Sequence, residues 1–349
     1  MTGPVTLSQV AREAGVSLAT ASRAINGSAT RVVRPDLRER VLEAARRLRY
    51  TPDANAQAVA RGRTTSVGLI VHDITDPYFS SIAAGVTEAA DAAGLVVTLA
   101  STQHSAEREL AFVDLVQRQR ARAVIVAGGR LDGGESTPAL VAALEAYRAH
   151  GGGVAFVGQR ISDLPTIEIA NRAGAGDLAR ALHGRGYRRF AVLGGPDGHL
   201  TGRDRREGFA DALAALGCLP PVVLGSAFTR DGGYAGMQEA LTLPERPELV
   251  FAANDVMAVG AMAAVRDAGL RVPDDVAVAG FDDIVTLRDV SPGLTTVRIP
   301  LAEVGARATR LALAEPGTAG EGGTAGEGRT AGSDVVRGEV VLRDSTPQR

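Results

Sequence analysis

Two groups of side chains in this chain have types and spacings that could do chemistry. The first is a run of short polar residues with one arginine, Arg23, between residues 6 and 26. Arginine can donate two parallel hydrogen bonds to guanine, while hydroxyls and amides bond phosphate oxygens. The second group is polar and aromatic residues that directly follow apolar runs further along the chain. If those runs are parallel strands, the residues after them are candidates for a ligand site, because ligands of such folds bind at the carboxyl ends of the strands.

Two short helices joined by a tight turn are expected to position the first group. Thr6 stands three residues before a glutamine, the spacing of a capping box, and Gly15 can adopt the positive φ that ends a helix. Ser17 is expected to cap a second helix, on which Ala21 and Ile25 point inward. Such a helix-turn-helix places its second helix in the major groove of DNA. A helical hairpin inside an enzyme is the alternative interpretation.

The charge distribution favours DNA binding. Residues 1–63 carry 11 arginines and five acidic residues, whereas the rest of the chain carries 27 arginines and 35 acidic residues. A basic end on an acidic body is expected where only that end meets phosphate. Pro35 opens a third helix, and the alanine-rich residues 53–60 are too short for a stable isolated helix. We therefore expect a headpiece over 1–52, then a hinge helix and linker over 53–63.

Composition bounds the class of protein. A chain of 349 residues that is 45% hydrophobic can bury a large core. Its single cysteine, Cys218, excludes an intramolecular disulfide and fits a reducing compartment. We find neither a signal-peptide pattern nor an apolar run of about 18 residues that could span a bilayer. We expect a cytoplasmic, nucleoid-associated protein with no membrane partner.

The remaining residues, 64–349, alternate short apolar runs with helical stretches. This alternation predicts βαβ units with parallel sheets. Because about 240 residues exceed one typical doubly wound domain, we expect two lobes, one of 64–160 plus 291–315 and one of 161–290 plus 334–345. The expected strands are 67–71, 96–100, 124–127, 154–157, 190–193, 222–224, 249–253 and 276–280.

One segment of this body is of low complexity. Residues 316–333 include a Gly/Thr/Glu-rich repeat that cannot bury enough apolar surface to order itself, so we expect a flexible insertion. A final strand-like run follows over 335–342. The chain contains no complete dinucleotide or P-loop pattern, no nucleophile elbow and no paired metal-ligand spacing. We therefore expect no catalytic activity, no cofactor and no bound metal.

Several longer motifs occur in a characteristic order and spacing. They include Val10-Ala-Arg-Glu-Ala-Gly-Val-Ser17, Thr20-Ala-Ser-Arg23, Tyr50-Thr-Pro52, Asp76-Pro-Tyr-Phe79, Ala253-Asn-Asp255 and Gly280-Phe-Asp-Asp283. Through these motifs the chain resembles the lactose/galactose-repressor (LacI-type) family of bacterial transcription regulators. The resemblance implies an all-α helix-turn-helix headpiece and an α/β periplasmic-binding-protein-like body of two doubly wound parallel-sheet lobes. It also implies a homodimer that binds a pseudo-palindromic operator in double-stranded DNA.

The resemblance assigns roles in DNA binding. Leu18 and Ala19 fall where the family's recognition helix reads base edges, and Arg23 matches its guanine-reading arginine. Val59 takes the place of the leucine that the family inserts into the minor groove, and its shorter side chain is expected to wedge less deeply. The residues expected at phosphates are Thr6, Ser17, Thr20, Ser22 and Asn26.

The resemblance also assigns an effector site. Arg205 matches the family's ligand-gripping arginine, Phe228 matches the aromatic that stacks on the ligand, and Gln159 stands where the family often has an aspartate. The other expected effector-binding residues are His72, Asp73, Asp76, Tyr78, Phe79, Asn254 and Asp282. Strand-end caps are the alternative for Asn254 and Asp282, and a core position is the alternative for Phe228.

We expect an allosteric regulator, most simply a repressor. A small molecule bound between the lobes changes their relative angle and thereby the affinity for the operator. A sugar is the expected effector because the site is rich in carboxylates and amides. A purine or nucleoside is the alternative, since aromatic residues could stack on it. A solute-binding protein without a DNA role is a further alternative. The C-terminus has no leucine heptads, so we expect a dimer and no tetramer-forming bundle.

Overall fold

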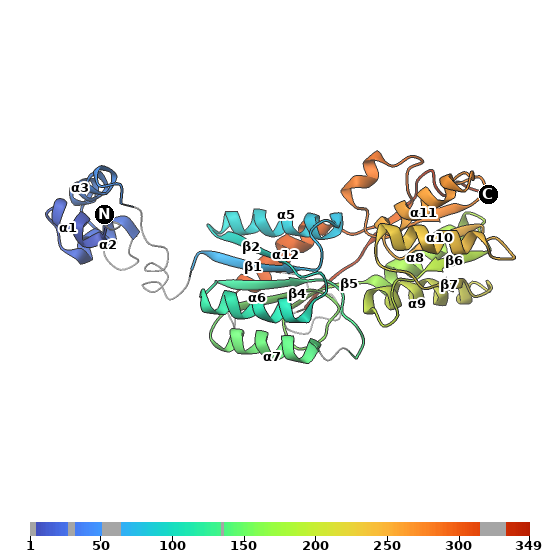
Figure 1. Cartoon of the computed structure of the whole chain (residues 1–349), viewed down its shortest axis with the longest axis horizontal. Helices are drawn as coiled ribbons and strands as arrows, with labels where there is room; N and C mark the ends of the chain where they lie inside the picture. The colour runs from blue at the N-terminus through green and yellow to red at the C-terminus, as the bar shows by residue number, and fades with distance from the viewer. Residues whose placement is uncertain (1–4, 27–31, 51–63, 134–135, 315–332) are drawn as a thin grey trace, which may run out of the picture. The chain divides into compact units, whose positions relative to one another are not determined.

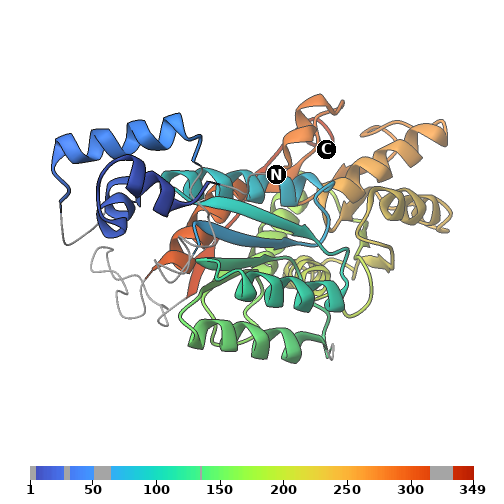
Figure 2. The ribbon, with the colours of Figure 1, turned by 60° about the vertical axis from the view of Figure 1, so that its left-hand side comes forward.

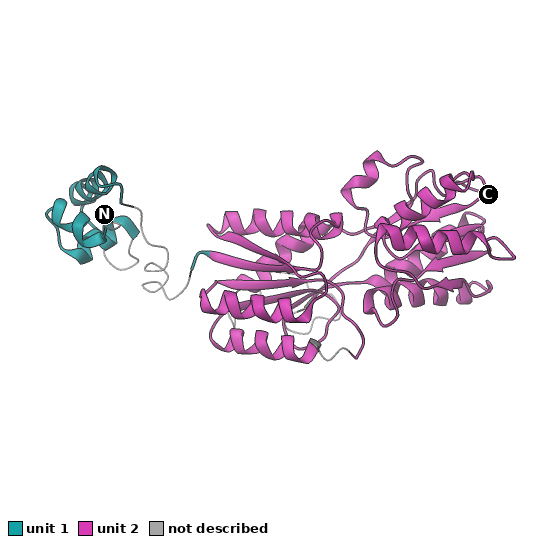
Figure 3. Ribbon diagram, in the orientation of Figure 1, with its two compact units in different colours: residues 1–65 teal, residues 66–349 magenta. Residues whose placement is uncertain are grey.

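The chain forms two compact units, residues 1–65 and 66–349 (Figure 3). The computed structural model describes residues 5–26, 32–50, 64–133, 136–314 and 333–349. The hinge and linker expected over 53–63, with Val59, and residues 316–332 of the expected insertion lie outside the described residues. In the part of the chain that is described, no helix is both long and apolar enough to cross a membrane.

The first unit is a three-helix headpiece. Its helices are α1 (Leu7–Glu13), α2 (Leu18–Asn26) and α3 (Pro35–Arg47). Thr6 and Gln9 form the expected capping box, and Gly15 has the expected positive φ of 63° after α1. The three helices share a small core made of Val10, Ala11, Ala14, Ala21, Ala24, Val41 and Ala44. The helix-turn-helix and the third helix predicted from the sequence are confirmed.

The first lobe of the second unit is built on a six-stranded sheet with the order β11-β5-β4-β3-β1-β2, parallel throughout. Its strands are β1 (Ser66–Val71), β2 (Val96–Ser101), β3 (Ala123–Ala127), β4 (Gly153–Gly158), β5 (Thr166–Ile169) and β11 (Ser333–Val336). Helices cover both faces (Figures 1 and 2). On one face lie α5 (Pro77–Ala92) and α12 (Leu301–Leu313), and on the other α6 (Ala106–Arg118) and α7 (Ser136–Ala149). Covered faces explain why the central strands are continuous apolar runs.

The second lobe is built on a parallel sheet with the order β7-β6-β8-β9. Its strands are β6 (Phe190–Leu193), β7 (Val222–Leu224), β8 (Leu249–Ala252) and β9 (Ala277–Ala279). Its helices are α8 (Asn171–Gly184), α9 (Leu200–Ala215), α10 (Arg230–Leu241), α11 (Asp255–Asp267) and the 3-10 helix η1 (Val285–Asp289). Phe190 packs against Phe209 of α9, whereas Leu193 approaches Gly236 of α10. Because positions 190 and 193 point to opposite faces of the strand, helices lie on both faces of this sheet as well.

The lobe boundaries differ from those expected. The strand β5 pairs with β4, and β11 pairs with β5, so residues 166–169 and 333–336 belong to the first lobe, whereas the sequence placed them in the second. The strand β10 (Thr296–Arg298) pairs with β12 (Glu339–Val341). Ser345, which follows β12, donates from Oγ to the carbonyl oxygen of Val278 in β9, so β10 and β12 lie in the second lobe. These short strands pair with partners distant in sequence, which local apolar patterning does not reveal.

The single strand expected over 335–342 is likewise two strands, β11 and β12, in different lobes. Between them lies Gly338, where a Cβ would meet Val297 Cγ1 at 2.5 Å. A glycine at this position therefore lets the backbone approach β10 closely as the chain passes from one lobe to the other. The eight strands expected within residues 67–280 are all present, with ends that agree to within one residue.

Candidate DNA-binding and effector sites

The helix α2 presents the face expected to meet DNA. Leu18 is 51% exposed and Ala19 is exposed, whereas Ala21 and Ala24 are buried in the headpiece core. Arg23 Nε donates to the carbonyl oxygen of Ala19 at 2.9 Å, so its side chain lies along the same face of the helix. The exposed start of α2 is thus the part of the headpiece that is free to contact bases.

The polar residues expected at phosphates have local roles as well. Thr6 caps α1, and Ser17 Oγ accepts a hydrogen bond from the N–H of Thr20 at 3.1 Å. Asn26 Nδ2 donates to Ser22 Oγ at 3.3 Å. These bonds order the two helix starts and the end of α2, the places where a backbone phosphate would lie against a helix-turn-helix.

The loops that follow the strands of the two lobes contact each other, and we call the residues of these loops the inter-lobe site. The N–H of Leu200 donates to the carbonyl oxygen of Arg130 at 2.9 Å, and the N–H of Asp132 donates to that of Gly198 at 2.7 Å. Gln159 Nε2 donates to Thr201 Oγ1 at 2.7 Å. Ligands of doubly wound folds bind at the carboxyl ends of strands, so this is where an effector is expected.

Arg205 is the centre of the second-lobe half of this site. It lies on α9, is 2% exposed, and donates from Nη2 to Asp282 Oδ1 at 2.7 Å. Its Nε donates to Asn171 Oδ1 at 2.8 Å, and its Nη1 donates to the carbonyl oxygen of Ala253 at 2.7 Å. Its Cζ lies 3.8 Å from the centre of the Phe281 ring. The guanidinium is therefore held in one orientation by groups from several elements.

The carboxylates around Arg205 are in an unfavourable environment for charge. Burial raises the pKa of Asp282 to about 6, although the neighbouring Arg205 charge opposes that shift. Asp282 also has φ of 117°, a backbone conformation that costs free energy in a residue other than glycine. Burial raises the pKa of Asp255 well above its ordinary value, and Asp255 accepts hydrogen bonds from the Ile284 N–H and the Thr296 hydroxyl. Strain and perturbed pKa values together make this cluster a candidate functional site.

Several expected effector residues form local caps and turns. Asp73 Oδ1 accepts from the N–H of Thr75, and Asp76 Oδ1 accepts from the N–H of Tyr78, both at 2.9 Å. Asn254 Oδ1 accepts from the N–H of Met257 at 2.9 Å and caps α11. The strand-end cap, the alternative interpretation, therefore describes Asn254 but not Asp282. Burial raises the pKa values of both Asp76 and Tyr78, and both feel the Arg205 charge, which places the start of α5 close to the second lobe.

The aromatic residues of the site divide between core and surface. Phe79 is 9% exposed, belongs to the hydrophobic core, and packs edge-on against Tyr78 and His72 with ring centres 5.0 and 5.6 Å apart. Phe228 is partly buried and faces His199, with ring centres 4.7 Å apart. Phe228 therefore remains at the edge of the inter-lobe site, whereas Phe79 supports it from within.

A first-lobe cluster was only partly anticipated. It joins His72 to Glu109, His104 and Arg130, and we call it the Arg130 cluster. Arg130 Nη1 donates to both carboxylate oxygens of Glu109 at 2.8 and 2.7 Å. His72 Nε2 lies 3.6 Å from Glu109 Oε1, and the rings of His72 and His104 have centres 4.1 Å apart. Arg130 and His104 follow β3 and β2, a signal the sequence analysis could have used, whereas Glu109 lies inside α6 and carries no such signal.

Burial keeps the histidines of the inter-lobe site neutral at pH 7. It lowers the pKa of His72 below its ordinary value, and it lowers the pKa values of His104 and His199 to about 4. His199, which the sequence analysis also missed, caps α9 and interacts electrostatically with His72 and Arg205. Although burial opposes it, contact with His72 and Arg130 lowers the pKa of Glu109. The Glu109–Arg130 pair is therefore ionised and its imidazole neighbours are not.

Three buried side chains of the inter-lobe site have unsatisfied polar atoms. These are Nε and Nη2 of Arg130, Oε1 of Gln159 and Oγ of Ser226, none of which has a hydrogen-bond partner among the described residues. They follow β3 and β4 of the first lobe and β7 of the second. Buried polar groups are almost always paired, so unpaired atoms from both lobes at one place indicate a polar ligand or ordered water.

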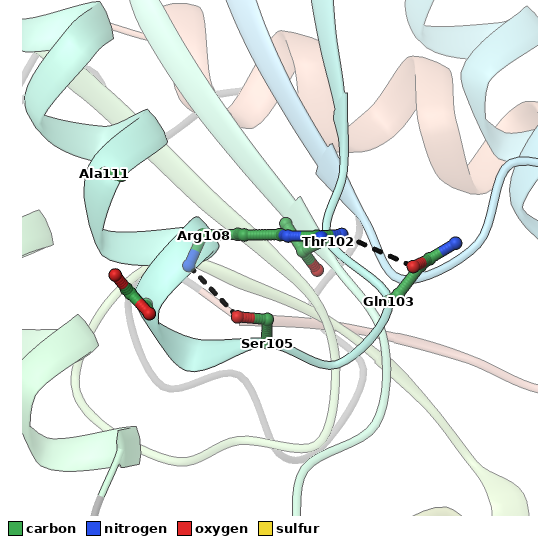
Figure 4. Close-up of a pocket in the computed structure, with 6 residues that line it drawn as sticks. Thr102, Gln103, Ser105, Arg108 and Ala111 are labelled. Carbon is green, nitrogen blue, oxygen red and sulfur yellow. Dashed lines mark hydrogen bonds between the residues drawn. The ribbon is translucent and has the colours of Figure 1, made fainter.

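A separate pocket of about 470 Å³ lies at the start of α6 (Figure 4). Arg108 Nη1 donates to Gln103 Oε1, and Ser105 Oγ accepts from the N–H of Arg108, each at 3.3 Å. It is lined by Thr102, Gln103, Ser105, Glu107, Arg108 and Ala111. None of the lining side chains has a buried polar atom without a partner among the described residues, so this pocket, unlike the inter-lobe site, gives no indication of a ligand.

The fold and the two sites define a ligand-responsive DNA-binding protein, and comparison with known proteins agrees. Residues 6–53 match the family of bacterial regulatory proteins described as the lacI family, and residues 179–346 match the periplasmic binding protein-like domain. The chain is 32% identical over 321 residues to the HTH-type transcriptional repressor CytR of Escherichia coli strain K12, covering 88% of this chain and 89% of that repressor. This chain therefore belongs to the lacI family and is a DNA-binding transcriptional regulator.

Solved structures share the fold. The lac repressor dimer bound to operator and the anti-inducer ONPF superposes with a TM-score of 0.84 at 26% identity, covering 99% of both chains. The complex of the transcriptional regulator CelR with cellobiose matches with a TM-score of 0.68 at 28% identity, covering 98% of this chain and 99% of that one. The predicted fold class, headpiece plus two-lobed periplasmic-binding-protein-like body, is confirmed.

Proposed function

We propose that this regulator is a repressor that binds a pseudo-palindromic operator as a homodimer, and that a sugar bound at the inter-lobe site changes its affinity for that operator. In this proposal the protein acts by regulated binding and catalyses no reaction. The observation that carries the effector assignment is the set of unpaired buried polar atoms contributed by both lobes, beside the Arg205–Asp282 ion pair.

The headpiece supports the DNA part of the proposal. Leu18 and Ala19 offer apolar contacts, for example to a thymine methyl group, and Arg23 reaches from the same helix to offer a bidentate contact to guanine. Thr6, Ser17, Thr20, Ser22 and Asn26 are assigned to phosphates, which fix the register of the helix on the duplex. The solved lac repressor, which this chain resembles over its whole length, is a dimer on its operator.

The inter-lobe site supports a polyhydroxylated effector. Gln159 Oε1, in the first lobe, can accept a hydrogen bond from a ligand hydroxyl, and Ser226 Oγ, in the second lobe, can donate or accept one. Asp282 and Arg205 present further acceptors and donors in a rigid arrangement. The transcriptional regulator CelR, which this chain resembles over nearly its whole length, was solved in complex with cellobiose, which supports a sugar as the effector.

The aromatic residues favour a sugar over a purine or nucleoside. A purine needs flat apolar surfaces on both faces of its ring. Phe79 lies in the core and packs against Tyr78 and His72, so its ring is not available to a ligand. Phe228 has one face against His199. One aromatic plate beside many hydrogen-bonding groups matches the apolar face and hydroxyl rim of a sugar ring.

The contacts between the loops of the two lobes supply the mechanism. The backbone bonds of Leu200 to Arg130 and of Asp132 to Gly198, with the Arg203–Asp132 ion pair, hold the lobes together without a ligand. A sugar that forms hydrogen bonds with both Gln159 and Ser226 stabilises the one relative orientation of the lobes in which both bonds can form. It can shift the equilibrium only by that difference in affinity, typically about 1–3 kcal/mol of coupling.

The test is to select genomic DNA fragments with the full-length protein at a fixed salt concentration, then to titrate the selected site by fluorescence anisotropy with and without sugars and nucleosides. We expect one palindromic site and a change in its affinity with at least one sugar. Arg205→Met is expected to bind the site but to ignore the sugar, while Arg266→Met, at an exposed arginine of α11, keeps the response. A response to nucleosides and to no sugar would overturn the effector assignment, and the absence of an enriched site would overturn the operator assignment.

A further inference from the structure

The guanidinium of Arg130 is engaged on one side only. Its Nη1 donates to both oxygens of Glu109 at 2.8 and 2.7 Å, and its Cζ lies 6.0 Å from the centre of the Phe156 ring. The residue is 8% exposed, and neither Nε nor Nη2 has a partner within the described part of the chain. A buried, charged side chain with an unused edge is unfavourable unless something else occupies that edge.

The unused edge has a specific shape. The N–H of Nε and one N–H of Nη2 point the same way and form two parallel donors. Such a pair matches the two oxygens of a carboxylate or phosphate, which it binds with two charge-assisted hydrogen bonds. Two neighbouring sugar hydroxyls can accept the same two donors, but their bonds lack the assistance of a negative charge and are weaker. The edge is therefore better suited to an anionic group than to a neutral one.

The surroundings divide the inter-lobe site by charge. Glu109 is neutralised by Arg130, and the adjacent His72 and His104 are neutral because burial lowers their pKa values. If one of these imidazoles is protonated when an anion binds beside it, the imidazolium charge stabilises the anion further. In the half of the site around Arg205, the guanidinium donates instead to both oxygens of Asp282, to Asn171 Oδ1 and to the Ala253 carbonyl oxygen, so it keeps no unpaired edge like that of Arg130.

The two halves belong to one site. The carbonyl oxygen of Arg130 accepts the N–H of Leu200, so Arg130 stands in the loop that touches the second lobe. His199 interacts electrostatically with both His72 and Arg205, one from each half. His199 therefore lies between the Arg130 half and the Arg205–Asp282 half of the site, where one ligand would contact both.

We propose that Arg130 is the anion-binding residue of the inter-lobe site and that the effector is a sugar bearing a carboxylate or a phosphate. This inference rests on the proposed function, since it specifies the class of sugar. The sugar hydroxyls bond Gln159, Ser226 and the Arg205–Asp282 pair, and the anionic group takes both free donors of Arg130.

The experiment uses matched sets of sugars with the full-length protein in isothermal titration calorimetry at constant ionic strength. One set is glucose, glucuronate and glucose 6-phosphate, and another is galactose, galacturonate and galactose 6-phosphate. We expect the acid or the phosphate of at least one set to bind at least about tenfold more tightly than its neutral parent. Whichever of the two binds more tightly identifies the anionic group.

Variants then locate the effect. Arg130→Lys keeps the charge opposite Glu109 but loses the parallel donors, so it is expected to remove the advantage of the anionic sugar over its neutral parent. Should that variant fold poorly by circular dichroism, the double variant Arg130→Met with Glu109→Gln removes both buried charges together. Arg266→Lys, at an exposed arginine, is the matched control and keeps the advantage.

The outcomes separate this inference from the proposed function. If neutral sugars bind as tightly as their charged counterparts, or if Arg130→Lys keeps the preference, the anion-binding role is wrong while the sugar effector stands. If no sugar of any set binds and nucleosides do, the proposed effector class is wrong and the inference falls with it.

Discussion

Removing Arg205 tests the energetics of the inter-lobe site most directly. Arg205 and Asp282 have side chains 2% and 4% exposed, so solvent screens their 2.7 Å contact very little. Replacing Arg205 with methionine leaves a buried carboxyl without its partner, which typically costs about 3–5 kcal/mol of folding free energy. The double variant Arg205→Met with Asp282→Asn removes both charges, so we expect it to be less destabilised than the sum of the two single variants by about 2 kcal/mol.

The pH dependence gives this prediction a second magnitude. Burial raises the folded pKa of Asp282 to about 6, above its ordinary value of 3.8. A carboxyl with a raised folded pKa favours folding fully below its unfolded pKa and less as the pH rises through the folded value. Without Arg205 that pKa rises further, so at pH 7 Asp282 is protonated in the variant and charged in the wild type. The wild type loses its proton at pH 6, one pH unit below 7, while the variant keeps it. The difference in unfolding free energy between wild type and Arg205→Met is therefore about 1.4 kcal/mol larger at pH 7 than at pH 5.

Urea unfolding at pH 7 and pH 5 measures both quantities. Tyrosine fluorescence reports on the body, because the chain has no tryptophan and its body contains Tyr78, Tyr147, Tyr187 and Tyr234. Strict additivity of the two substitutions, together with a stability difference that does not change with pH, would refute the account of Arg205 and Asp282 as a coupled buried pair.

Three further predictions concern other parts of the molecule. Burial lowers the folded pKa of His199 to about 4, against 6.5 when unfolded, so this residue alone should make the wild type about 3 kcal/mol less stable at pH 4 than at pH 7. The variant His199→Asn keeps a helix cap but cannot titrate, so urea unfolding should show that it lacks this part of the acid destabilisation. Gly85→Ala places a Cβ onto the Ala302 carbonyl and should lower the melting temperature, whereas Gly184→Ala, in open space, should not. Arg23→Ala should weaken binding to the selected operator by about 1–3 kcal/mol in anisotropy titrations, with non-specific DNA much less affected.

Much of the fold was predictable because its signals are local. The capping box at Thr6, the positive φ at Gly15 and the inward positions of α2 depend on neighbours a few residues apart. The apolar runs that became β1 to β4 and β6 to β9 are continuous because helices cover both faces of the sheets. Short strands such as β5 and β10 lack such runs, and their pairing with distant partners decides which lobe they join.

The inter-lobe site remains a prediction, and the sequence indicated its position better than its contacts. A strand end indicated Asp282, whereas only the family resemblance indicated Arg205, which lies inside α9; their ion pair joins residues 77 positions apart. The pairing of Glu109 with Arg130, 21 positions apart, carries no comparable sequence signal. Nor could the sequence distinguish Asn254, which caps a helix, from a ligand-binding residue, because both roles use the same amide at the same strand end.

The sequence by itself determined the class of this protein: a helix-turn-helix headpiece, a body of parallel α/β lobes, and the strand ends at which a ligand would be held. These follow from caps, turns and apolar runs, in which each residue's neighbours along the chain supply the information. Only the tertiary structure decided which lobe each short strand joins, that Phe79 is core, and that Arg130 has two donors left free. Those outcomes depend on which residues distant in the sequence come into contact, because that contact sets their burial, their pKa values and their hydrogen bonds.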